Sequence, residues 1–429
     1  TQALLLLVDR HPALSSRFEL TGGVWRQTIL EQNDRTILIS VDLSQLDKDH
    51  SEKLFERLAG DAQRSLDLAN GPLTRSVLAT LPGGARRLFL TIHHLVVDWV
   101  SWRILVADLD NLAKYMVQGI NSATHQEGTS FKAWAETLCR YSSSSKLAGE
   151  AAYWLEIDGH QESRLAVKPE GANNVGSERW FDASLNEPLS RLLIQEAPKH
   201  YGARAQDLLI AALLLAWREL TGSNSILLDF ESHGRPDSFP GVDLSGTVGW
   251  FTAIFPLALV LPEGLDSIRD NSRIVQALHQ QLEAVPDRGI GFGTLKYLCP
   301  NQEIRSKLEA LPKPQVSFNY LGQFDQALPQ DSLFLPVGTR TGEYRNPEGL
   351  RSHVLDVQLS VIDGVVALGL IYSENLLSRE IIERLAASYL NNLEDLIVNR
   401  PAHQPVQSGT RLDAIPLVDQ AVLDSLRAR

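Results

Sequence analysis

The sequence predicts an α/β protein of the α+β kind, divided into two lobes. The chain has 429 residues, which is longer than a single hydrophobic core usually supports. An apolar-poor stretch at residues 158–178 separates two halves, and each half runs from strand-rich to helix-rich. Strands and helices alternate without the regular strand–helix repeat of a parallel sheet, so we expect mainly antiparallel or mixed sheets.

The first half, residues 1–165, is predicted from two kinds of pattern. Apolar residues three or four positions apart, such as Leu54 and Leu58, indicate helices, whereas apolar runs next to glycine pairs indicate strands and turns. Helices are predicted at residues 2–10, 50–68, 99–117, 131–141 and 151–157. Strands are predicted at residues 17–20, 24–30, 36–41, 74–81 and 87–92.

The second half, residues 166–412, follows the same rules. The helix at 207–219 is the most strongly apolar one, and a turn at Asp363 and Gly364 joins two alternating strands into an antiparallel pair. The predicted helices are 189–197, 207–219, 274–282 and 380–398. The predicted strands are 226–230, 248–257, 316–324, 355–361 and 365–372, and a proline-rich stretch at 401–416 ends the globular part.

Composition narrows the class of function. Hydrophobic residues make up 44% and charged residues 21%, as is ordinary for a soluble globular protein, and the net charge of −12 without a long basic run argues against nucleic acid or membrane partners. No apolar segment reaches the roughly 18 residues that span a bilayer. Cys139 and Cys299 lie far apart without ligand-like neighbours, which favours a reducing, cytoplasmic compartment over a zinc site or disulfide scaffold. The chain starts without Met inside a helical pattern, so we expect a piece of something longer.

A pair of histidines lies between the end of a predicted buried strand and the start of a predicted helix. His93 and His94 follow the apolar run at 87–92, and such a junction holds titratable groups rigidly, as acid–base chemistry requires. A structural loop histidine is the competing interpretation. His94 and Asp98 could also face one metal ion, but no third ligand follows at a recognisable spacing, so we expect no metal.

Asp98 has a structural interpretation of its own. It precedes the helix at 99–117, so its carboxylate can cap the helix by accepting from the backbone near Val100 or Ser101. Pairing with an arginine is a second option that would shape the loop. We favour structure over chemistry for Asp98.

The second half offers two further sets of candidates. Glu231 ends an apolar strand, where burial would raise its pKa toward the range useful for proton exchange near neutrality. A surface position, or an ion pair with Arg235, is the alternative. Asn319 and Tyr320 place polar groups within an apolar strand, and such groups need partners, of which a substrate carbonyl is one.

Taken together, the motifs resemble the condensation superfamily of non-ribosomal peptide synthetases, and specifically its epimerization branch. Residues 93–98 have the form HHxxxD, and condensation domains usually continue with Gly where this chain has Trp99. The loop after Glu231 departs from the branch at Ser232 and Pro236, where Gly and Glu are usual. The other matching segments are residues 99–105, 231–236, 248–252, 286–293 and 318–324, in the order of the family.

The resemblance implies two chloramphenicol-acetyltransferase-like lobes forming a V-shaped pseudo-dimer, with the active site in a tunnel between them. His94 from one lobe and Glu231 from the other would be catalytic, and His93, Asp98, Ser101, Asn319 and Tyr320 would support the site or position the substrate. The substrate would be an aminoacyl or peptidyl thioester, delivered on the phosphopantetheine arm of an upstream carrier domain without any intrinsic cofactor. Residues 413–429 resemble the linker to a downstream module.

The implied reaction inverts the Cα of the carrier-bound residue from L toward D. His94 and Glu231 would act on opposite faces as base and acid, or Glu231 would be the base while His94 stabilises the enolate, and the sequence leaves both assignments open. A condensation domain that joins two carrier-bound substrates is the alternative enzyme. A non-catalytic module that docks carrier domains is the third interpretation.

Overall fold

A computed structural model describes residues 1–30, 37–120, 128–159, 164–168, 170–264, 270–323, 328–329, 331–338, 341 and 345–401 of the chain. The predicted linker at 413–429 lies outside these residues, as does Phe324. Within them, helices and strands of both halves form a mixed α/β fold, as predicted. No helix in this described part of the chain is long and apolar enough to cross a membrane.

The first half is built on a three-stranded sheet in the order β3-β4-β5. Strand β3 runs parallel to β4 and β5 runs antiparallel to it, so the sheet is mixed. Its strands are β3 (Leu38–Asp42), β4 (Thr74–Thr80) and β5 (Arg86–Ile92), and a separate hairpin pairs β1 (Ser16–Thr21) with β2 (Val24–Ile29). Its helices are α1 (Gln2–Arg10), α2 (Lys48–Arg64) and α3 (Trp99–Val117).

The second half is built on a six-stranded sheet in the order β6-β11-β10-β9-β7-β8. Strand β9 runs parallel to both β7 and β10, and the remaining pairs are antiparallel. The strands are β6 (Glu178–Ser184), β7 (Ser225–Ser232), β8 (Ala253–Val260), β9 (Val316–Gln323), β10 (Leu355–Ile362) and β11 (Val365–Ser373). The helices from α4 onward are α4 (Phe131–Tyr141), α5 (Ser145–Leu155), α6 (Glu187–Gln195), α7 (Ala197–Tyr201), α8 (Ala205–Thr221), α9 (Asn271–Glu283), α10 (Ile290–Leu298), α11 (Gln302–Glu309) and α12 (Arg379–Val398).

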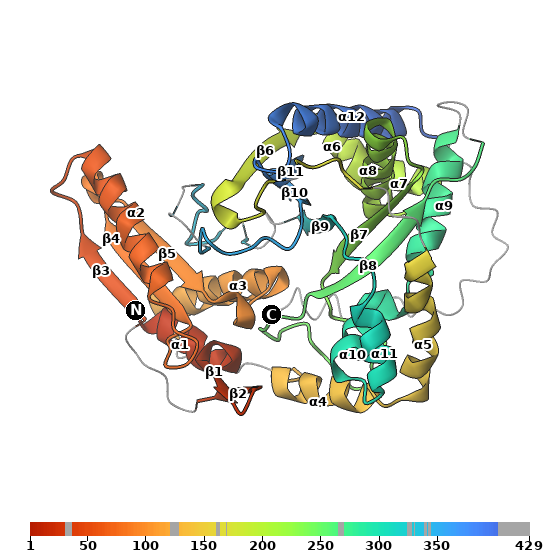
Figure 1. Ribbon diagram of the computed structural model, residues 1–429. Helices are drawn as coiled ribbons and strands as arrows, with labels where there is room; N and C mark the ends of the chain where they lie inside the picture. The colour runs from red at the N-terminus through yellow and green to blue at the C-terminus, as the bar shows by residue number, and fades with distance from the viewer. Residues whose placement is uncertain are drawn as a thin grey trace, which may run out of the picture.

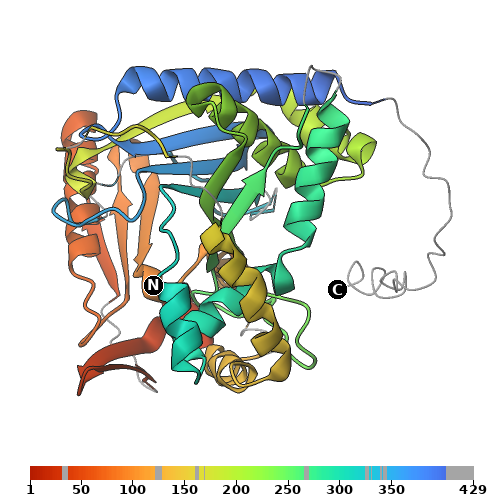
Figure 2. The ribbon, with the colours of Figure 1, turned by 45° about the vertical axis from the view of Figure 1, so that its right-hand side comes forward.

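One face of the six-stranded sheet carries the largest hydrophobic core. Leu228 and Phe230 of β7 and Val357 of β10 point to this face, and they pack in one cluster with the apolar sides of α8 and α12. Both views show α12 lying along the sheet (Figures 1 and 2). Because side chains alternate along a strand, the residues between these apolar ones point to the opposite face, which carries polar side chains.

The two halves diverge in a V, with the three-stranded sheet, α2 and α3 in one arm and the six-stranded sheet in the other (Figure 1). Helices α4 and α5 come from before residue 165, yet Trp134 and Trp154 pack with residues of the second half. The division of the chain at 165 and 166 stays a prediction.

Some segments of the structure differ from the predicted elements. Residues 248–252 were expected within a strand, but β8 begins only at Ala253, because the backbone of Gly249 and Phe251 bonds to side chains of the first half. Strand β6 was not predicted, since its polar side chains suit an exposed sheet edge. Helices α7, α10 and α11 were not predicted either, and α10 lies within a glycine-rich motif.

Candidate active site

The histidine motif is a short turn between β5 and α3. A single 3-10 turn, His94–Val96, follows the strand, and the Nδ1 atom of His93 accepts a hydrogen bond from the backbone of Leu95 at 3.2 Å. Burial, with a smaller contribution from neighbouring His94, lowers the pKa of His93. His94 itself is exposed, and its ring lies 4.9 Å from the ring of Trp250 in the second half. His93 therefore shapes the turn and His94 is left accessible.

Asp98 combines both structural roles that the sequence suggested. Its Oδ1 atom accepts from the backbone N–H of Ser101 at 2.7 Å and so caps α3. The same carboxylate receives the Arg235 guanidinium at 3.2 and 3.3 Å and the Phe251 N–H at 3.1 Å. Asp98 is only 3% exposed, so a buried ion pair joins the first half to the loop that follows Glu231.

Ser101 and Trp99 add further contacts between the start of α3 and the second half. The Ser101 hydroxyl donates to the carbonyl of Gly249 at 2.8 Å and accepts from its N–H at 3.1 Å. The indole N–H of Trp99 donates to the carbonyl of Leu321 at 2.9 Å, on the strand that carries Asn319. The start of α3 thus contacts three separate segments of the second half.

Glu231 lies near the end of β7 on the polar face of the six-stranded sheet. In the strand register it faces Ile254 of β8 on one side and Asn319 of β9 on the other. The Asn319 amide donates to its Oε2 atom at 2.6 Å. Burial, reinforced by the negative charge of Asp356, raises the pKa of Glu231 to about 7.

Glu231 does not form the ion pair with Arg235 that was its alternative interpretation. The Arg235 guanidinium is used by Asp98, by Ser101 and by two backbone carbonyls, those of Leu244 at 2.6 Å and Thr247 at 2.7 Å. Among the described residues, no cation lies within ion-pair distance of the Glu231 carboxylate. Glu231 is therefore a partly buried carboxyl that can exchange a proton near neutrality.

Tyr320 does not join this group. It follows Asn319 in an extended strand, so the two side chains point to opposite faces, and Tyr320 packs against the main hydrophobic core. Burial raises the pKa of its hydroxyl. Of these two candidate residues, only Asn319 therefore lies beside Glu231.

The turn that carries His94 and the end of strand β7, which carries Glu231, are joined through residues at matching positions. Asp98 lies four residues after His94, Arg235 lies four residues after Glu231, and these two form the buried ion pair. Trp250 brings a second contact to His94 itself. The arrangement supplies one accessible imidazole on a turn and one carboxyl of raised pKa at a strand end, held together across the two halves.

Some residues of the site were not among the sequence candidates. Trp250 lacks any local signal, although it lies within one of the family-like motifs. Asp229 could have been found, because alternation along β7 places it on the same face as Glu231. Within the described part of the chain, no three His, Cys, Asp or Glu side chains are grouped to hold a metal ion. The expectation of a metal-free site remains a prediction.

Comparison with known proteins gives a consistent result. A family model described as Condensation domain matches residues 1–411. The chain is 36% identical over 405 residues to one of the linear gramicidin synthase proteins of Brevibacillus parabrevis, covering 92% of this chain and 8% of that protein. It is 33% identical to chondramide synthase of Chondromyces crocatus, covering 100% of this chain and 11% of that protein. The chain therefore spans a small part of these relatives.

Solved structures show the same fold. The epimerization domain from the third module of a tyrocidine synthetase superposes with a TM-score of 0.84 at 29% identity, covering 92% of this chain and 87% of that one. The first condensation domain of the calcium-dependent antibiotic synthetase superposes with a TM-score of 0.67 at 18% identity, covering 94% and 88%. These likenesses confirm the predicted two-lobed fold class.

Proposed function

This chain belongs to the condensation domain family, and we propose that it is an epimerization domain of a non-ribosomal peptide synthetase. Its substrate is an aminoacyl or peptidyl residue held as a thioester on the phosphopantetheine arm of a carrier domain. The reaction removes the Cα proton and returns it from the opposite face, so that L is converted toward D. The carrier domain upstream and the next module downstream are its partners.

The environment of Glu231 carries this proposal. A carboxyl with a pKa of about 7 can both accept and release a proton at neutral pH, as a reversible exchange at Cα requires. Peptide-bond formation, the alternative reaction, needs no proton transfer at Cα. The 29% identity to an epimerization domain and the Trp99 that follows Asp98 support the same choice.

The chemistry explains why two groups are needed. Removing the proton beside a thioester leaves an anion that spreads onto the carbonyl oxygen, and inversion requires reprotonation from the other face. His94 and Glu231 come from different halves of the fold, so one can act as base and the other as acid, with the roles exchanged in the reverse direction. In a second assignment Glu231 is the base and His94 donates to the enolate oxygen. Asn319 orients the Glu231 carboxylate in both.

Exchange of the Cα proton for deuterium in heavy water tests the proposal on a carrier loaded with a donor thioester alone. We expect His94→Ala and Glu231→Gln to lower the exchange rate by about 100-fold or more, since each removes a proton-transfer group. His50→Ala and Glu303→Gln are matched controls, because both side chains are largely exposed at 76% and 73% and lie away from the site.

Two outcomes would contradict the proposal. If both site variants exchange at the wild-type rate, the two-residue mechanism is wrong. If the intact domain neither exchanges the proton nor changes the configuration of the released thioester, then a condensation domain or a non-catalytic docking module is the better description. Adding an acceptor-loaded carrier separates these two, since only a condensation domain then forms a peptide bond.

A further inference from the structure

Two carboxylates lie beside Glu231 on the polar face of the six-stranded sheet. Asp229 precedes Glu231 by two residues on β7 and so points to the same face, roughly 7 Å along the strand. The register pairs Asp229 with Ser317 of β9, and Ser317 in turn with Asp356 of β10. Asp229 and Asp356 therefore occupy the row next to Glu231.

His353 lies between these two carboxylates. Its Nε2 atom is 2.7 Å from Asp229 and its Nδ1 atom is 3.3 Å from Asp356, with only 13% of the side chain exposed. An imidazole that faces a carboxylate with each nitrogen donates from both only when it is protonated. Burial opposes this charge, but the contacts with Asp229 and Asp356 outweigh it and raise the pKa of His353 to about 9.

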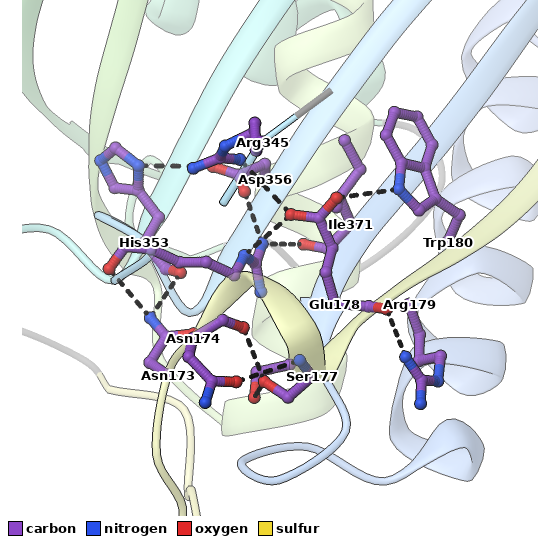
Figure 3. Close-up of polar contacts among 12 residues, drawn as sticks. Asn173, Asn174, Ser177, Glu178, Arg179, Trp180, Arg345, His353, Asp356 and Ile371 are labelled. Atoms are coloured by element: carbon purple, nitrogen blue, oxygen red, sulfur yellow. Dashed lines mark hydrogen bonds and ion pairs between the residues drawn. The ribbon is translucent and has the colours of Figure 1, made fainter. Parts of the chain in front are cut away.

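On the side away from Glu231, further side chains hold the network around His353 in place. Arg351, which is 5% exposed, donates to Asp356 at 2.6 Å and lies 3.3 Å from Glu178 of β6. The amide of Asn173 donates to the carbonyl of His353 at 2.8 Å and holds its backbone (Figure 3). Acidic and basic side chains alternate along this chain of contacts, so His353 supplies the charge that balances the carboxylates nearest Glu231.

We propose that His353 is a positioning residue for Glu231. As an imidazolium, it balances the negative charges of Asp229 and Asp356, and this balance keeps the Glu231 carboxyl able to lose and regain a proton near neutrality. This inference rests on the proposed function for its catalytic meaning. The electrostatic coupling itself follows from the geometry of the sheet.

The direction of each influence on Glu231 follows from the sign of its neighbours. Burial raises its pKa most, Asp356 and Asp229 raise it further, and His353 lowers it. The strands on either side place uncharged residues in the row of Glu231, since Ile254 of β8 and Asn319 of β9 flank it. Removing the histidine charge and removing an aspartate charge should therefore have opposite effects.

Two variants test this. His353→Gln should raise the pKa of Glu231 by about one unit, because Asp229 and Asp356 are then unbalanced. Asp229→Asn should lower it, since Asp356 still pairs with the imidazolium and one negative charge is gone. The pKa is measured directly by NMR titration of ¹³C-labelled glutamate carboxyls, with Glu231→Gln used to assign the signal. The pH dependence of Cα deuterium exchange is recorded on the same variants.

His279→Gln is the matched control, because it removes another histidine–aspartate contact of the second half, the 2.7 Å contact with Asp207. It should leave the titration of Glu231 unchanged. General destabilisation would move both test variants in the same direction, and if His353→Gln does not fold, His353→Asn takes its place. The proposal is overturned if neither variant moves the Glu231 titration or both move it alike. If the titrations move oppositely but the intact wild-type domain does not exchange deuterium, the coupling stands and the proposed function fails.

Discussion

At the scale of a single residue, Glu231 shows how a strand position changes the chemistry of a side chain. The carboxyl receives one hydrogen bond, from Asn319, and lies beside two other acidic groups. Water that would stabilise the charged form in the unfolded chain is partly replaced by the sheet. The folded protein therefore binds this proton more tightly than the unfolded chain does, and the ionised form opposes folding.

We predict that Glu231→Gln is more stable than the wild type at pH 8, by about 1–2 kcal/mol. The pKa of this acid is raised from 4.5 to about 7, so the wild type loses stability as pH rises through that window, and the loss is complete above pH 7. The glutamine keeps an oxygen that can accept from Asn319 without carrying charge. Urea unfolding at pH 5 and pH 8 measures the difference.

The advantage of Glu231→Gln should shrink toward pH 5, where the wild-type carboxyl is largely protonated in the folded protein. The exposed change Glu303→Gln should show no comparable pH dependence. Equal stability of wild type and Glu231→Gln at both pH values would contradict the raised pKa.

At the scale of an element, the end of β7 determines the path of the loop at residues 248–252. The strand ends at Ser232, and Gly234 follows with φ +62 beside the carbonyl of Phe251. This close approach lets residues 248–252 run as a loop against α3 instead of extending β8. The backbone groups of that loop bond to Asp98 and Ser101, which a regular strand would not allow.

We predict that Gly234→Ala disrupts this packing more than its backbone angle alone requires. A Cβ at Gly234 would lie 1.6 Å from the Phe251 oxygen. At Gly202 the angle is nearly the same, φ +61, and nothing lies within 4 Å. Gly202→Ala should therefore cost only about 1–2 kcal/mol of left-handed strain, and Gly234→Ala should cost at least about 2 kcal/mol more and abolish deuterium exchange. Equal unfolding midpoints for the two variants would refute this explanation.

At the scale of the whole molecule, buried polar contacts join the start of α3 to the second half, in addition to the apolar packing of α4 and α5. Asp98 and Arg235 are 137 positions apart, and their ion pair is reinforced by Ser101 and by the Phe251 ring, which lies 4.0 Å from the guanidinium. Trp99 adds a hydrogen bond to β9. These contacts set the position of the turn that carries His94 relative to the end of β7, which carries Glu231.

We predict that Arg235→Met lowers the free energy of unfolding by about 3–5 kcal/mol, because it leaves Asp98 as a buried charge without its cation. The double variant Asp98→Asn with Arg235→Met should lose less than the sum of the two single variants. Chemical denaturation of the four proteins measures this coupling. Arg379→Met breaks an exposed pair with Glu383 and should change stability by about 0.5 kcal/mol or less. Strict additivity at the buried pair would contradict the coupling.

The pattern of amino acids predicts much of the fold because helices, strands and caps depend on near neighbours. The helix Trp99–Val117 and its cap at Asp98, the hairpin around Gly22 and Gly23, and the pair β10 and β11 all follow from spacing within a few residues. Segments with weak local patterns, such as the polar edge strand β6, escape this reasoning because their partners stabilise them.

The site residues, too, are predicted partly from local pattern, whereas their partners are known only from the tertiary structure. Local pattern and motif resemblance single out His94, Asp98, Glu231 and Asn319 as candidates. Only the tertiary structure pairs Asp98 with Arg235, turns Tyr320 into the core and brings His353 to Asp229, which lies 124 positions away. Charge and burial at these positions come from segments remote in the chain, and the pKa of Glu231 depends on them.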